Sequence, residues 1–386
     1  MSSAPRFDID PDAFWRDPYP ALTAMRSEAP IAFVPQLNAT LMVKRNDIAL
    51  NEKKIDVFSS VQPDGLMTQL MGQNMMRKDG RDHRAERKAI FPAISPKTVK
   101  EVWRASFDAM ADRVLDELHP LKQADMARDI ARRLAGEALC IVTGLVNMDW
   151  QTMDQVSQAM VDGCANYGGD PAVEAHCLAS VETIDKHVRA RLEAVSKNPD
   201  QSLLSVQKLS GMSDLQNCRN IRLAISGGQN ETRDAIAGTV WALLSHPDQL
   251  AKISEGEASW LDAFEEYARW MSPIGMSPRR VAQAYRYGHV DFEPEDRVFF
   301  MFGSGNRDED IFESPEQFNV SRDCTQAISF GAGPHFCAGA WISKCLIAEV
   351  VLPKLFNRFE GLRLTGEAPF GGWAFRGPLR MPIAWN

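Results

Sequence analysis

The sequence lacks the usual marks of a secreted or membrane-embedded protein. No apolar run reaches the roughly 18 residues that a membrane-spanning helix needs. The opening stretch, MSSAPRFDIDPDAFWRDPYP, has no basic start followed by an apolar segment. The seven cysteines are scattered without a CxxC pair, which is typical of reduced thiols in a chain too large to need disulfide bonds. We therefore expect a cytoplasmic protein that does not associate with a membrane.

Positive charge is also scarce. The 43 Lys and Arg residues stand against 51 Asp and Glu residues, which gives a net charge of −8. A protein without a net positive field is not expected to bind nucleic acid in general. The composition, 45% hydrophobic and 24% charged, is that of a globular protein. Since no repeat or low-complexity linker divides the chain, we expect a single domain over residues 1–386, acting as a monomer.

Helical periodicity dominates the chain. An amphipathic pattern runs from about residue 81 to 210, and the apolar pattern predicts one long central helix over 214–245. Ser213 and Gln216 predict a capping box at the start of that helix, and Pro247 follows its end. Further helices are predicted over 259–271 and 338–359, and short strands within 31–45, 279–302 and 362–385. The fold class expected is mainly α with small β sections.

The most informative stretch is FGAGPHFCAGAWISK, residues 330–344. Three glycines, Gly331, Gly333 and Gly339, allow the backbone to approach another group closely. Cys337 stands where the loop enters a helix, and amide groups at a helix start favour a thiolate over a thiol. A thiolate at this place can act as a nucleophile or as a metal ligand.

Several kinds of site are excluded by what is missing around Cys337. Zinc would need further Cys or His ligands at short spacing, and Cys345 lies two helical turns away. A phosphate-binding loop would end in Gly-Lys-Ser/Thr, which is absent. A cysteine nucleophile would need a histidine base, and the alternation of the loop turns His335 away. A single soft axial ligand to a heme iron fits what remains.

The pattern Phe-Gly-x-Gly-x-His-x-Cys-x-Gly resembles the heme-binding loop of the cytochrome P450 family. The resemblance extends over nearly the whole chain. It implies a P450 fold with heme b between the long central helix and the cysteine loop, and Cys337 as the ligand of the iron. It also implies an oxidoreductase, a monooxygenase that inserts oxygen into a C–H bond. The matching residues are Phe330, Gly331, Gly333, His335, Cys337 and Gly339.

The resemblance also assigns roles outside the cysteine loop. It implies that Glu266, Arg269 and Arg322 form a buried ionic trio with a structural role, and that Asn306-Arg307-Asp308 is a structural turn. Cations that hold the heme propionates by charge-assisted hydrogen bonds are expected at His83, Arg87, His335 and Arg280. Arg279 is adjacent to Arg280 and remains an alternative to it. Phe330 and Gly331 are expected to contact the heme.

The central stretch SGGQNETRDAIAG, residues 226–238, matches the place where the family kinks a helix over the heme. Two registers compete for its acid–alcohol pair, which delivers protons. One alignment with the family places Glu231 at the acid position and Thr232 at the alcohol position. The other alignment, which needs no gap, places Asn230 at the acid position and Glu231 at the alcohol position. We favour the ungapped register, because a one-residue shift rotates a helix by about 100°. A carboxylate is a proton shuttle, so our hypothesis is that Glu231 lets the enzyme use hydrogen peroxide as a peroxygenase.

The substrate class is inferred from two short sequence pieces. The pieces RWMSPI and GGWAFRGP resemble a bacterial branch of the family that includes aryl-ether O-demethylases and reductase-fused enzymes. This suggests a small aromatic substrate, such as a methoxy-arene, with Phe375 near the pocket. Hydroxylation of a terpene or fatty acid, and a heme-thiolate isomerase or gas sensor, remain alternatives. Four methionines are interpreted as pocket lining or, more simply, as core: Met67, Met71, Met75 and Met76.

We expect the electrons to come from separate proteins, because residues 1–386 include no stretch that resembles a reductase. A ferredoxin or flavodoxin with its reductase is the donor that the resemblance implies. A basic cluster could dock such an acidic donor, or could simply be a solvated helix face. The cluster consists of Arg77, Lys78, Arg81, Arg84 and Lys88.

Overall fold

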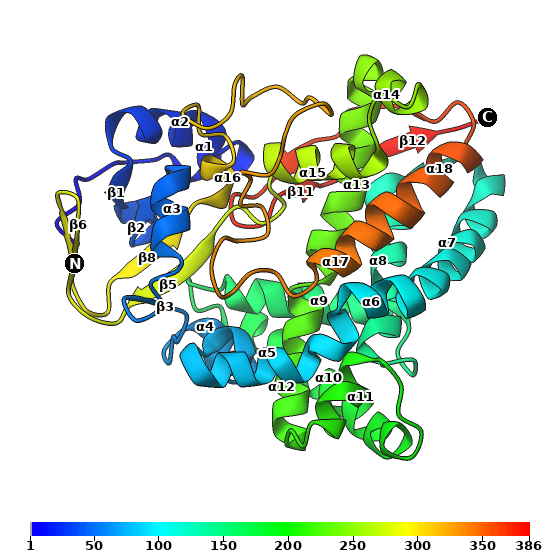
Figure 1. Ribbon diagram of the computed structural model, residues 1–386, viewed down its shortest axis with the longest axis horizontal. Coiled ribbons are helices and arrows are strands. Elements are labelled where there is room, and N and C mark those ends of the chain that lie inside the picture. The colour runs from blue at the N-terminus through cyan, green and yellow to red at the C-terminus, as the bar shows by residue number, and fades with distance from the viewer. Residues whose placement is uncertain (1) are drawn as a thin grey trace. The chain divides into compact units, whose positions relative to one another are not determined.

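The structure is a computed structural model that describes residues 2–386, and its contacts divide the chain into two compact units (Figure 1). Unit 1 consists of residues 1–61, 237–337 and 364–382. Unit 2 consists of residues 62–236, 338–363 and 383–386. Each unit is therefore assembled from segments that lie far apart in the sequence.

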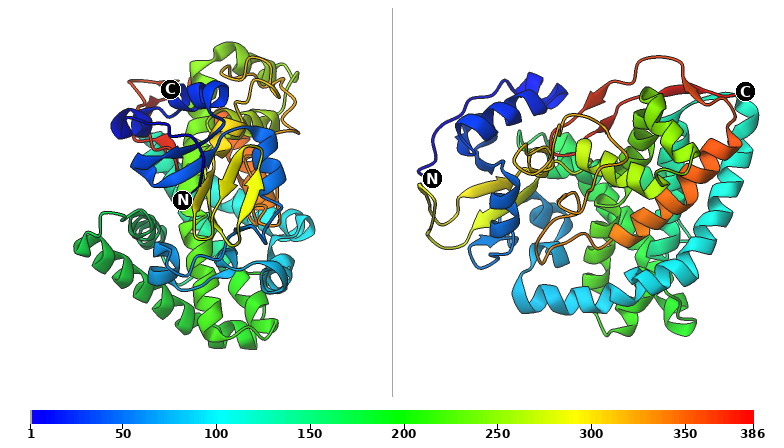
Figure 2. Two further views of the ribbon diagram at one scale, coloured as in Figure 1. Left: turned by 90° about the vertical axis from the view of Figure 1, so that its left-hand side faces the viewer. Right: turned by 45° about the horizontal axis from the view of Figure 1, so that its top comes forward.

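A five-stranded sheet forms the base of unit 1, with strand order β1-β2-β8-β5-β3. β1 and β2 are antiparallel, and Asn38 turns the chain between them with a positive φ of 45°, a conformation that asparagine tolerates well. β2 then pairs in parallel with β8 from much later in the chain, so early and late strands lie side by side (Figure 2). The strands are β1 (Ile31–Val34), β2 (Ala39–Met42), β3 (Phe58–Ser59), β5 (Ser277–Val281) and β8 (Arg297–Phe300).

Aromatic side chains fill one face of this sheet. The ring of Phe58 packs edge-on against Phe292 and Phe300 with centroids 5.4 and 5.5 Å apart, an arrangement that adds to the effect of area burial alone. Two hairpins complete the strands of unit 1: β6 (Tyr285–Tyr287) with β7 (Val290–Phe292), and β10 (Phe370–Gly371) with β11 (Gly377–Pro378).

Two helices of unit 1 begin at clear capping residues. Asp10 accepts hydrogen bonds from two backbone amides at the start of α1, and Ser259 with Asp262 forms a full capping box at the start of α15. The helices of unit 1 are α1 (Pro11–Arg16), α2 (Tyr19–Glu28), α3 (Arg45–Asn51), α14 (Pro247–Ser254), α15 (Trp260–Trp270) and α16 (Phe302–Gly305).

Unit 2 is almost entirely helical, with α10 packed against α9, α11 and α12. Its helices are α4 (Leu66–Met71), α5 (Gly80–Ile94), α6 (Pro96–Thr98), α7 (Arg104–Leu118), α8 (Arg132–Thr143), α9 (Trp150–Cys164), α10 (Pro171–Lys197), α11 (Leu203–Leu209), α12 (Asp214–Ser226), α17 (Ala340–Lys344) and α18 (Leu352–Arg358). π-helical stretches are Val99–Trp103, Met126–Ala131 and Cys345–Val351. A small sheet joins β4 (Gln123–Asp125), β12 (Pro382–Ala384) and β9 (Arg363–Leu364).

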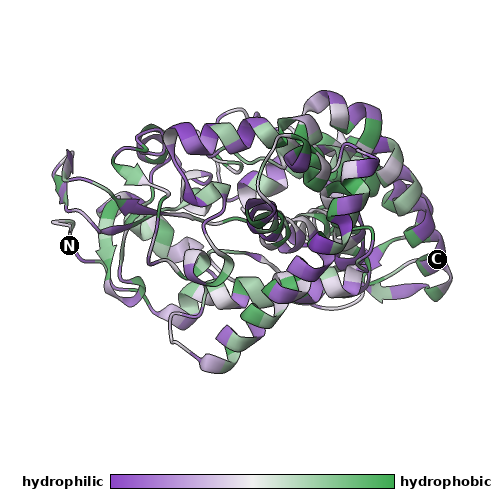
Figure 3. Cartoon of the chain, turned by 90° about the horizontal axis from the view of Figure 1, so that it is seen from below, coloured by the Kyte–Doolittle hydropathy of each residue, from purple (hydrophilic) through white to green (hydrophobic). Residues whose placement is uncertain are grey.

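Amphipathic faces explain why these helices form a core. On α7 the buried side chains Phe107, Met110, Ala111, Val114 and Leu115 recur at spacings of three and four residues. Figure 3 shows that hydrophobic and hydrophilic segments follow one another along the helices. The predicted helical pattern over 81–210 is thereby confirmed, except for the short strand β4.

The prediction of one continuous central helix is wrong. The structure has two helices, α12 (Asp214–Ser226) and α13 (Gln229–Ser245), separated by Gly227 and Gly228. A Cβ at Gly228 would lie 2.5 Å from the carbonyl oxygen of Ala224, so the tight break depends on glycine, which also has low helix propensity. α13 begins in unit 2 and continues in unit 1.

The predicted capping box at the start of α12 is only half present. Ser213 accepts a hydrogen bond from the Gln216 amide at 3.2 Å. The Gln216 side chain does not return to Ser213; instead its Nε2 donates to Glu86 at 3.1 Å. The predicted fold class, mainly α with small β sections, is confirmed, and the single domain stays a prediction. Among residues 2–386, no helix is both long enough and apolar enough to span a membrane.

Candidate functional site

The cysteine loop of unit 1 forms a compact turn that presents Cys337. The Cys337 amide donates to the Phe330 carbonyl at 2.8 Å, and the Phe336 amide donates to Gly333 at 3.0 Å. Gly331 has a φ of 84°, which residues with a Cβ rarely adopt. Cys337 is half-buried, and α17 follows it along the chain. The turn therefore holds the thiol where an incoming group can reach it.

The other six cysteines are poor candidates for a thiolate. Burial raises the pKa of Cys140, Cys164 and Cys345 to about 12 and that of Cys218 to about 11. Burial also raises the pKa of Cys177 and Cys324. These groups stay protonated at neutral pH and act as small hydrophobic side chains.

Asn306 fastens the start of the cysteine loop. This fully buried residue accepts a hydrogen bond from the Ile328 amide at 2.7 Å and donates to the hydroxyls of Ser329 and Ser272 at 3.2 and 3.0 Å. Asp308, two residues later, accepts from the Arg45 amide at 2.8 Å. The prediction that this stretch is a structural turn is confirmed.

The predicted ionic trio is also confirmed. Arg269 donates to both carboxylate oxygens of Glu266, at 2.7 and 2.8 Å, and Arg322 donates to Glu266 at 3.2 Å. Arg269 reaches the carbonyl of Asn306 as well, at 2.8 Å. The trio therefore connects α15 with the residue that fastens the cysteine loop.

The two adjacent arginines of β5 have different surroundings. Arg279 is 3% exposed and pairs at 3.2 Å with Glu52, which is equally buried. Arg280 is half-buried; its Nε donates to the Val61 carbonyl at 2.9 Å, and it pairs with Glu295, whose side chain is 66% exposed. The ion pair of Arg280 is therefore the easier one to exchange for another anion.

In unit 2, His83 and Arg87 lie one helical turn apart on α5, His83 buried and Arg87 half-buried. His335, in unit 1, is half-buried. The predicted basic cluster is smaller than expected, because Arg77 is buried and Lys78 forms an ion pair with Glu86. Its exposed members are Arg81, Arg84 and Lys88.

At the start of α13, the side chain of Asn230 is hydrogen-bonded and that of Glu231 is not. The Asn230 amide donates to Gln158 at 3.2 Å, and its oxygen accepts from Arg233 at 3.4 Å. Glu231 and Thr232 are half-buried, but both carboxylate oxygens of Glu231 are enclosed and have no hydrogen-bond partner. Burial raises the pKa of Glu231 to about 7. A carboxyl group in this state can gain or lose a proton at neutral pH.

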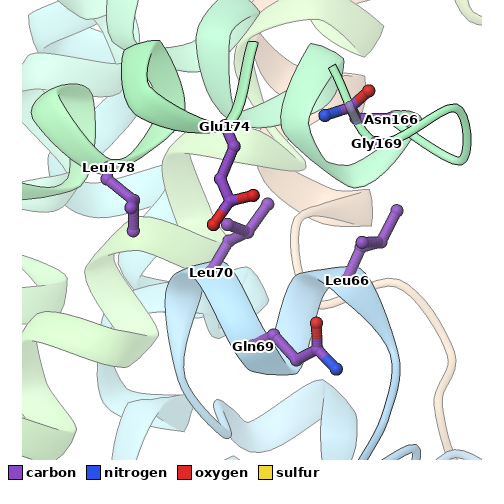
Figure 4. A pocket seen from close by; sticks show the side chains of 7 residues that line it. All are labelled: Leu66, Gln69, Leu70, Asn166, Gly169, Glu174 and Leu178. Atoms are coloured by element: carbon purple, nitrogen blue, oxygen red, sulfur yellow. The ribbon is translucent and has the colours of Figure 1, made fainter. Parts of the chain in front are cut away.

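A cavity of about 240 Å³ lies in unit 2 between α4, α10 and the loop that precedes α10. The Glu174 side chain points toward Leu70 across this cavity (Figure 4). Its lining is Leu66, Gln69, Leu70, Asn166, Gly169, Glu174 and Leu178. The interpretation of the methionines as pocket lining is not supported for this cavity, since Met71 and Met75 are buried and none of the four methionines lines it.

The pieces RWMSPI and GGWAFRGP lie side by side in unit 1. Ile274 forms an antiparallel bridge with Phe375, the Gly275 amide donates to Ala374 at 2.8 Å, and the Arg376 amide donates to Pro273 at 2.9 Å. Ile274 is half-buried and Phe375 is 39% exposed. The pairing therefore presents an apolar edge.

Three residues around these groups were missed by the sequence analysis. Glu52 binds Arg279 and the cysteine loop, Gln158 binds Asn230, and Glu174 points into the cavity. None of the three belongs to a recognisable motif. Their contacts or positions become visible only in the structure.

Comparison with known proteins agrees with the fold and the cysteine loop. A family model described as Cytochrome P450 matches residues 262–369. Cytochrome P450 107B1 of Saccharopolyspora erythraea is 27% identical over 323 residues, 81% of this chain and 77% of that protein. Vitamin D(3) 25-hydroxylase of Pseudonocardia autotrophica is 25% identical over 366 residues, 90% and 88% of the two chains.

Among solved structures, P450BioI in complex with hexadec-9Z-enoic acid ligated acyl carrier protein has a TM-score of 0.88 at 21% identity. The match covers 97% of this chain and 100% of that one. This likeness shows the cytochrome P450 fold. The family model and the curated relatives agree with this fold, because all of them place the similarity of the chain within the cytochrome P450 family.

The chain is therefore an oxidoreductase, a monooxygenase whose cofactor is heme held through its iron by a cysteine thiolate. Its residues fit this cofactor. Cys337 is half-buried at the end of a glycine-rich turn, and a single soft sulfur is a known heme ligand.

Proposed function

We propose that the chain oxidises a C–H bond of a small, apolar, aromatic substrate, and that Glu231 carries the proton for this reaction. The observation that carries the proposal is the enclosed carboxyl group of Glu231, which has no hydrogen-bond partner and a pKa near 7. A proton carrier needs both protonation states within reach at the working pH. Most other acids in the chain are paired or exposed and do not combine these properties.

We assign the heme ligands as follows. Cys337 binds the iron, and the bound heme supplies oxygen activation. His83, Arg87, Arg280 and His335 hold the propionates, while Phe330 and Gly331 pack against the ring. Arg280 is preferred to Arg279 because the buried Arg279 is already engaged with Glu52, whereas the partner of Arg280 is a largely exposed carboxylate.

With hydrogen peroxide as oxidant, Glu231 acts on both oxygens of the peroxide. As a carboxylate it accepts the proton of one oxygen, and as an acid it returns that proton to the other, which leaves as water. The reaction RH + H₂O₂ → ROH + H₂O then needs no electron donor. With dioxygen, the same product requires two electrons and two protons, and Glu231 carries protons inward.

The neighbours of Glu231 have supporting roles in this proposal. Asn230 fixes the start of α13 by its hydrogen bond to Gln158, and Thr232 is adjacent to the proton carrier. The competing register makes Glu231 the acid and Thr232 the alcohol. The two registers differ in whether the hydroxyl of Thr232 is needed.

An aryl methyl ether is the proposed substrate. Oxidation of its methyl C–H bond gives a hemiacetal, which releases formaldehyde and a phenol. The apolar edge of Ile274 and Phe375 supports an aromatic ligand, because aromatic contacts contribute strongly to binding.

A larger apolar substrate, such as a terpenoid, steroid or fatty acyl chain, is the second candidate. The names of the relatives, a vitamin D(3) hydroxylase and a complex with an acyl carrier protein, favour it.

Electrons for the dioxygen route come from a redox partner. We propose an acidic ferredoxin or flavodoxin with its reductase. The exposed cations Arg81, Arg84 and Lys88 on α5 support docking of such a protein, and the effect of such charges falls mainly on the association rate.

The experiment compares wild type with the Cys337→Ser, Glu231→Gln and Thr232→Val variants. The reduced carbon monoxide complex of wild type should show the red-shifted thiolate band, and Cys337→Ser should lose it. Formaldehyde release from aryl methyl ethers and oxidation of a steroid and fatty-acid panel are then measured with peroxide and, separately, with a ferredoxin system. Glu231→Gln should lose most peroxide-driven turnover, while Thr232→Val should retain it.

Loss of turnover in Thr232→Val as well as in Glu231→Gln would support the competing register, and an active Glu231→Gln would contradict the proposed role of Glu231. A wild type that binds heme but incorporates no oxygen into any substrate would favour an isomerase or sensor and overturn the proposal.

A further inference from the structure

Glu52 is a buried carboxylate that the proposed reaction does not use. It follows α3 directly, and its backbone amide closes that helix by donating to Ile48 at 2.8 Å. The residue is only 2% exposed. A carboxylate is costly to bury unless it is paired, so its partners show what it does.

Those partners belong to two different elements of unit 1. One oxygen of Glu52 accepts a hydrogen bond from the Arg279 guanidinium of β5 at 3.2 Å. The other accepts from the backbone amide of Ala332 at 2.6 Å. Glu52 therefore joins the sheet to the cysteine loop through one side chain.

The loop is shaped to meet this residue. A Cβ at Gly333 would lie 2.5 Å from the carbonyl oxygen of Glu52, and one at Gly331 would lie 3.4 Å from its carboxylate. The loop backbone thus rests directly on Glu52. Glycine at position 333 is needed because this approach leaves no space for a side chain.

The contact continues to the cysteine within five residues. The Phe336 amide donates to Gly333, and the Cys337 amide donates to Phe330, so Ala332 lies inside the turn that ends at the sulfur. A shift at Ala332 would be transmitted to the position of Cys337.

Glu52 also affects the surroundings of the cysteine loop through its charge. Arg279 is also buried and lies over the ring of Phe300 at 5.6 Å. Without Glu52, this cation would lose its buried counter-charge in a medium where charges interact strongly. The positive charge would then stand next to the cysteine loop and to Arg280.

We propose that Glu52 is a positioning residue for the cysteine loop, which it holds at Ala332 while it balances the charge of Arg279. The proposal rests on the proposed role of Cys337 as the heme ligand. It predicts that Glu52 tunes the reduction potential of the bound iron and the integrity of the thiolate bond.

Two substitutions separate the two effects. In Glu52→Gln the side chain keeps its size and an acceptor oxygen for Ala332, but loses its charge. The midpoint potential should shift upward, because the loss of a nearby negative charge favours the reduced iron. In Glu52→Ala the acceptor is lost as well, and a severalfold larger share of the carbon monoxide complex should lack the thiolate band.

The double variant Glu52→Gln with Arg279→Gln restores the charge balance and should return the potential toward the wild-type value. Glu309→Gln is the matched control, because Glu309 pairs with Arg26 at 2.7 Å elsewhere in unit 1. This control should change neither the potential nor the spectrum. Spectroelectrochemistry of the heme-loaded proteins gives the potential, and circular dichroism verifies that each variant is folded.

An unchanged potential in Glu52→Gln, or a full thiolate band in folded Glu52→Ala, would overturn the proposal. Failure of the underlying assignment is recognised separately, because wild type itself would then lack the thiolate band or Cys337→Ser would retain it.

Discussion

Arg269 donates two nearly parallel hydrogen bonds to Glu266, and both side chains are almost completely inaccessible to solvent. The remaining donors of Arg269 reach the carbonyls of Asn306, Pro315 and Gln317. A buried ion pair whose donors are all satisfied fixes a geometry, even where it adds little net stability. In this chain it fixes the segment that leads into the cysteine loop.

Glu266→Gln should therefore destabilise the protein strongly. The substitution leaves the buried Arg269 and the adjacent Arg322 without a counter-charge, a change that typically costs about 3–5 kcal/mol. Chemical denaturation of the heme-loaded protein measures this loss in the free energy of unfolding.

Glu349→Gln is the control for this prediction. Glu349 pairs with Arg104 at 2.8 Å, but both side chains are about half exposed, so its loss should cost less than about 1 kcal/mol. Equal effects of the two substitutions would show that the trio has no special structural role.

The fold was largely predictable from local sequence patterns. The exception is the break between α12 and α13, which has a physical explanation. Periodicity predicted the helices of unit 2, and short apolar runs predicted the segments that contain most of the strands. The resemblance placed a kink at this stretch, but periodicity alone missed the break at Gly227 and Gly228, because the apolar pattern continues through it. Periodicity records which face is buried, not whether the hydrogen-bond ladder is intact.

The candidate site was predictable only where a motif marks it. Cys337 and the Glu266 trio belong to spaced patterns that a sequence displays. Glu52 carries no such pattern, because its partners are 227 and 280 positions away. Likewise, strand pairing decides whether Arg279 or Arg280 faces a buried carboxylate. The sequence of two adjacent arginines does not indicate this pairing.

Gly238→Ala should destabilise the protein through a steric conflict in unit 1. A Cβ at Gly238 would overlap the phenol ring of the buried Tyr267, which must then move within a packed core. Overpacking of this kind typically costs about 1–3 kcal/mol. Thermal and urea unfolding measure the effect.

A double-mutant cycle tests the cause. In the Tyr267→Leu background, Gly238→Ala should cost much less, because the ring is no longer there. Additive effects of the two substitutions would contradict the steric explanation.

Arg280→Gln should accelerate heme loss. A charge-assisted hydrogen bond contributes about 1.5–3 kcal/mol, so the loss of one propionate ligand should raise the rate of heme transfer to an excess of apomyoglobin about tenfold or more. Arg297→Gln, on the neighbouring strand β8, is the control and should leave the rate unchanged. An unaltered rate in Arg280→Gln would remove this residue from the proposed ligand set.

Glu231 should make stability depend on pH in a particular direction. Its pKa is about 7 in the folded chain against an ordinary value of 4.5, because burial disfavours the charged form. Between these two values the folded state retains a proton that the unfolded state has lost. The free energy of unfolding therefore falls as the pH rises from about 4.5 to about 7, by up to ~3 kcal/mol.

The Glu231→Gln variant should lack this fall, so its stability relative to wild type should be higher at pH 8 than at pH 5. Peroxide-driven turnover should follow the same ionisation: it should rise in wild type as the pH passes about 7, because the carboxylate accepts the first proton, and the residual turnover of Glu231→Gln should show no such rise. Urea unfolding and initial rates at several pH values measure both. A rise that persists in Glu231→Gln would assign the proton transfer to another group.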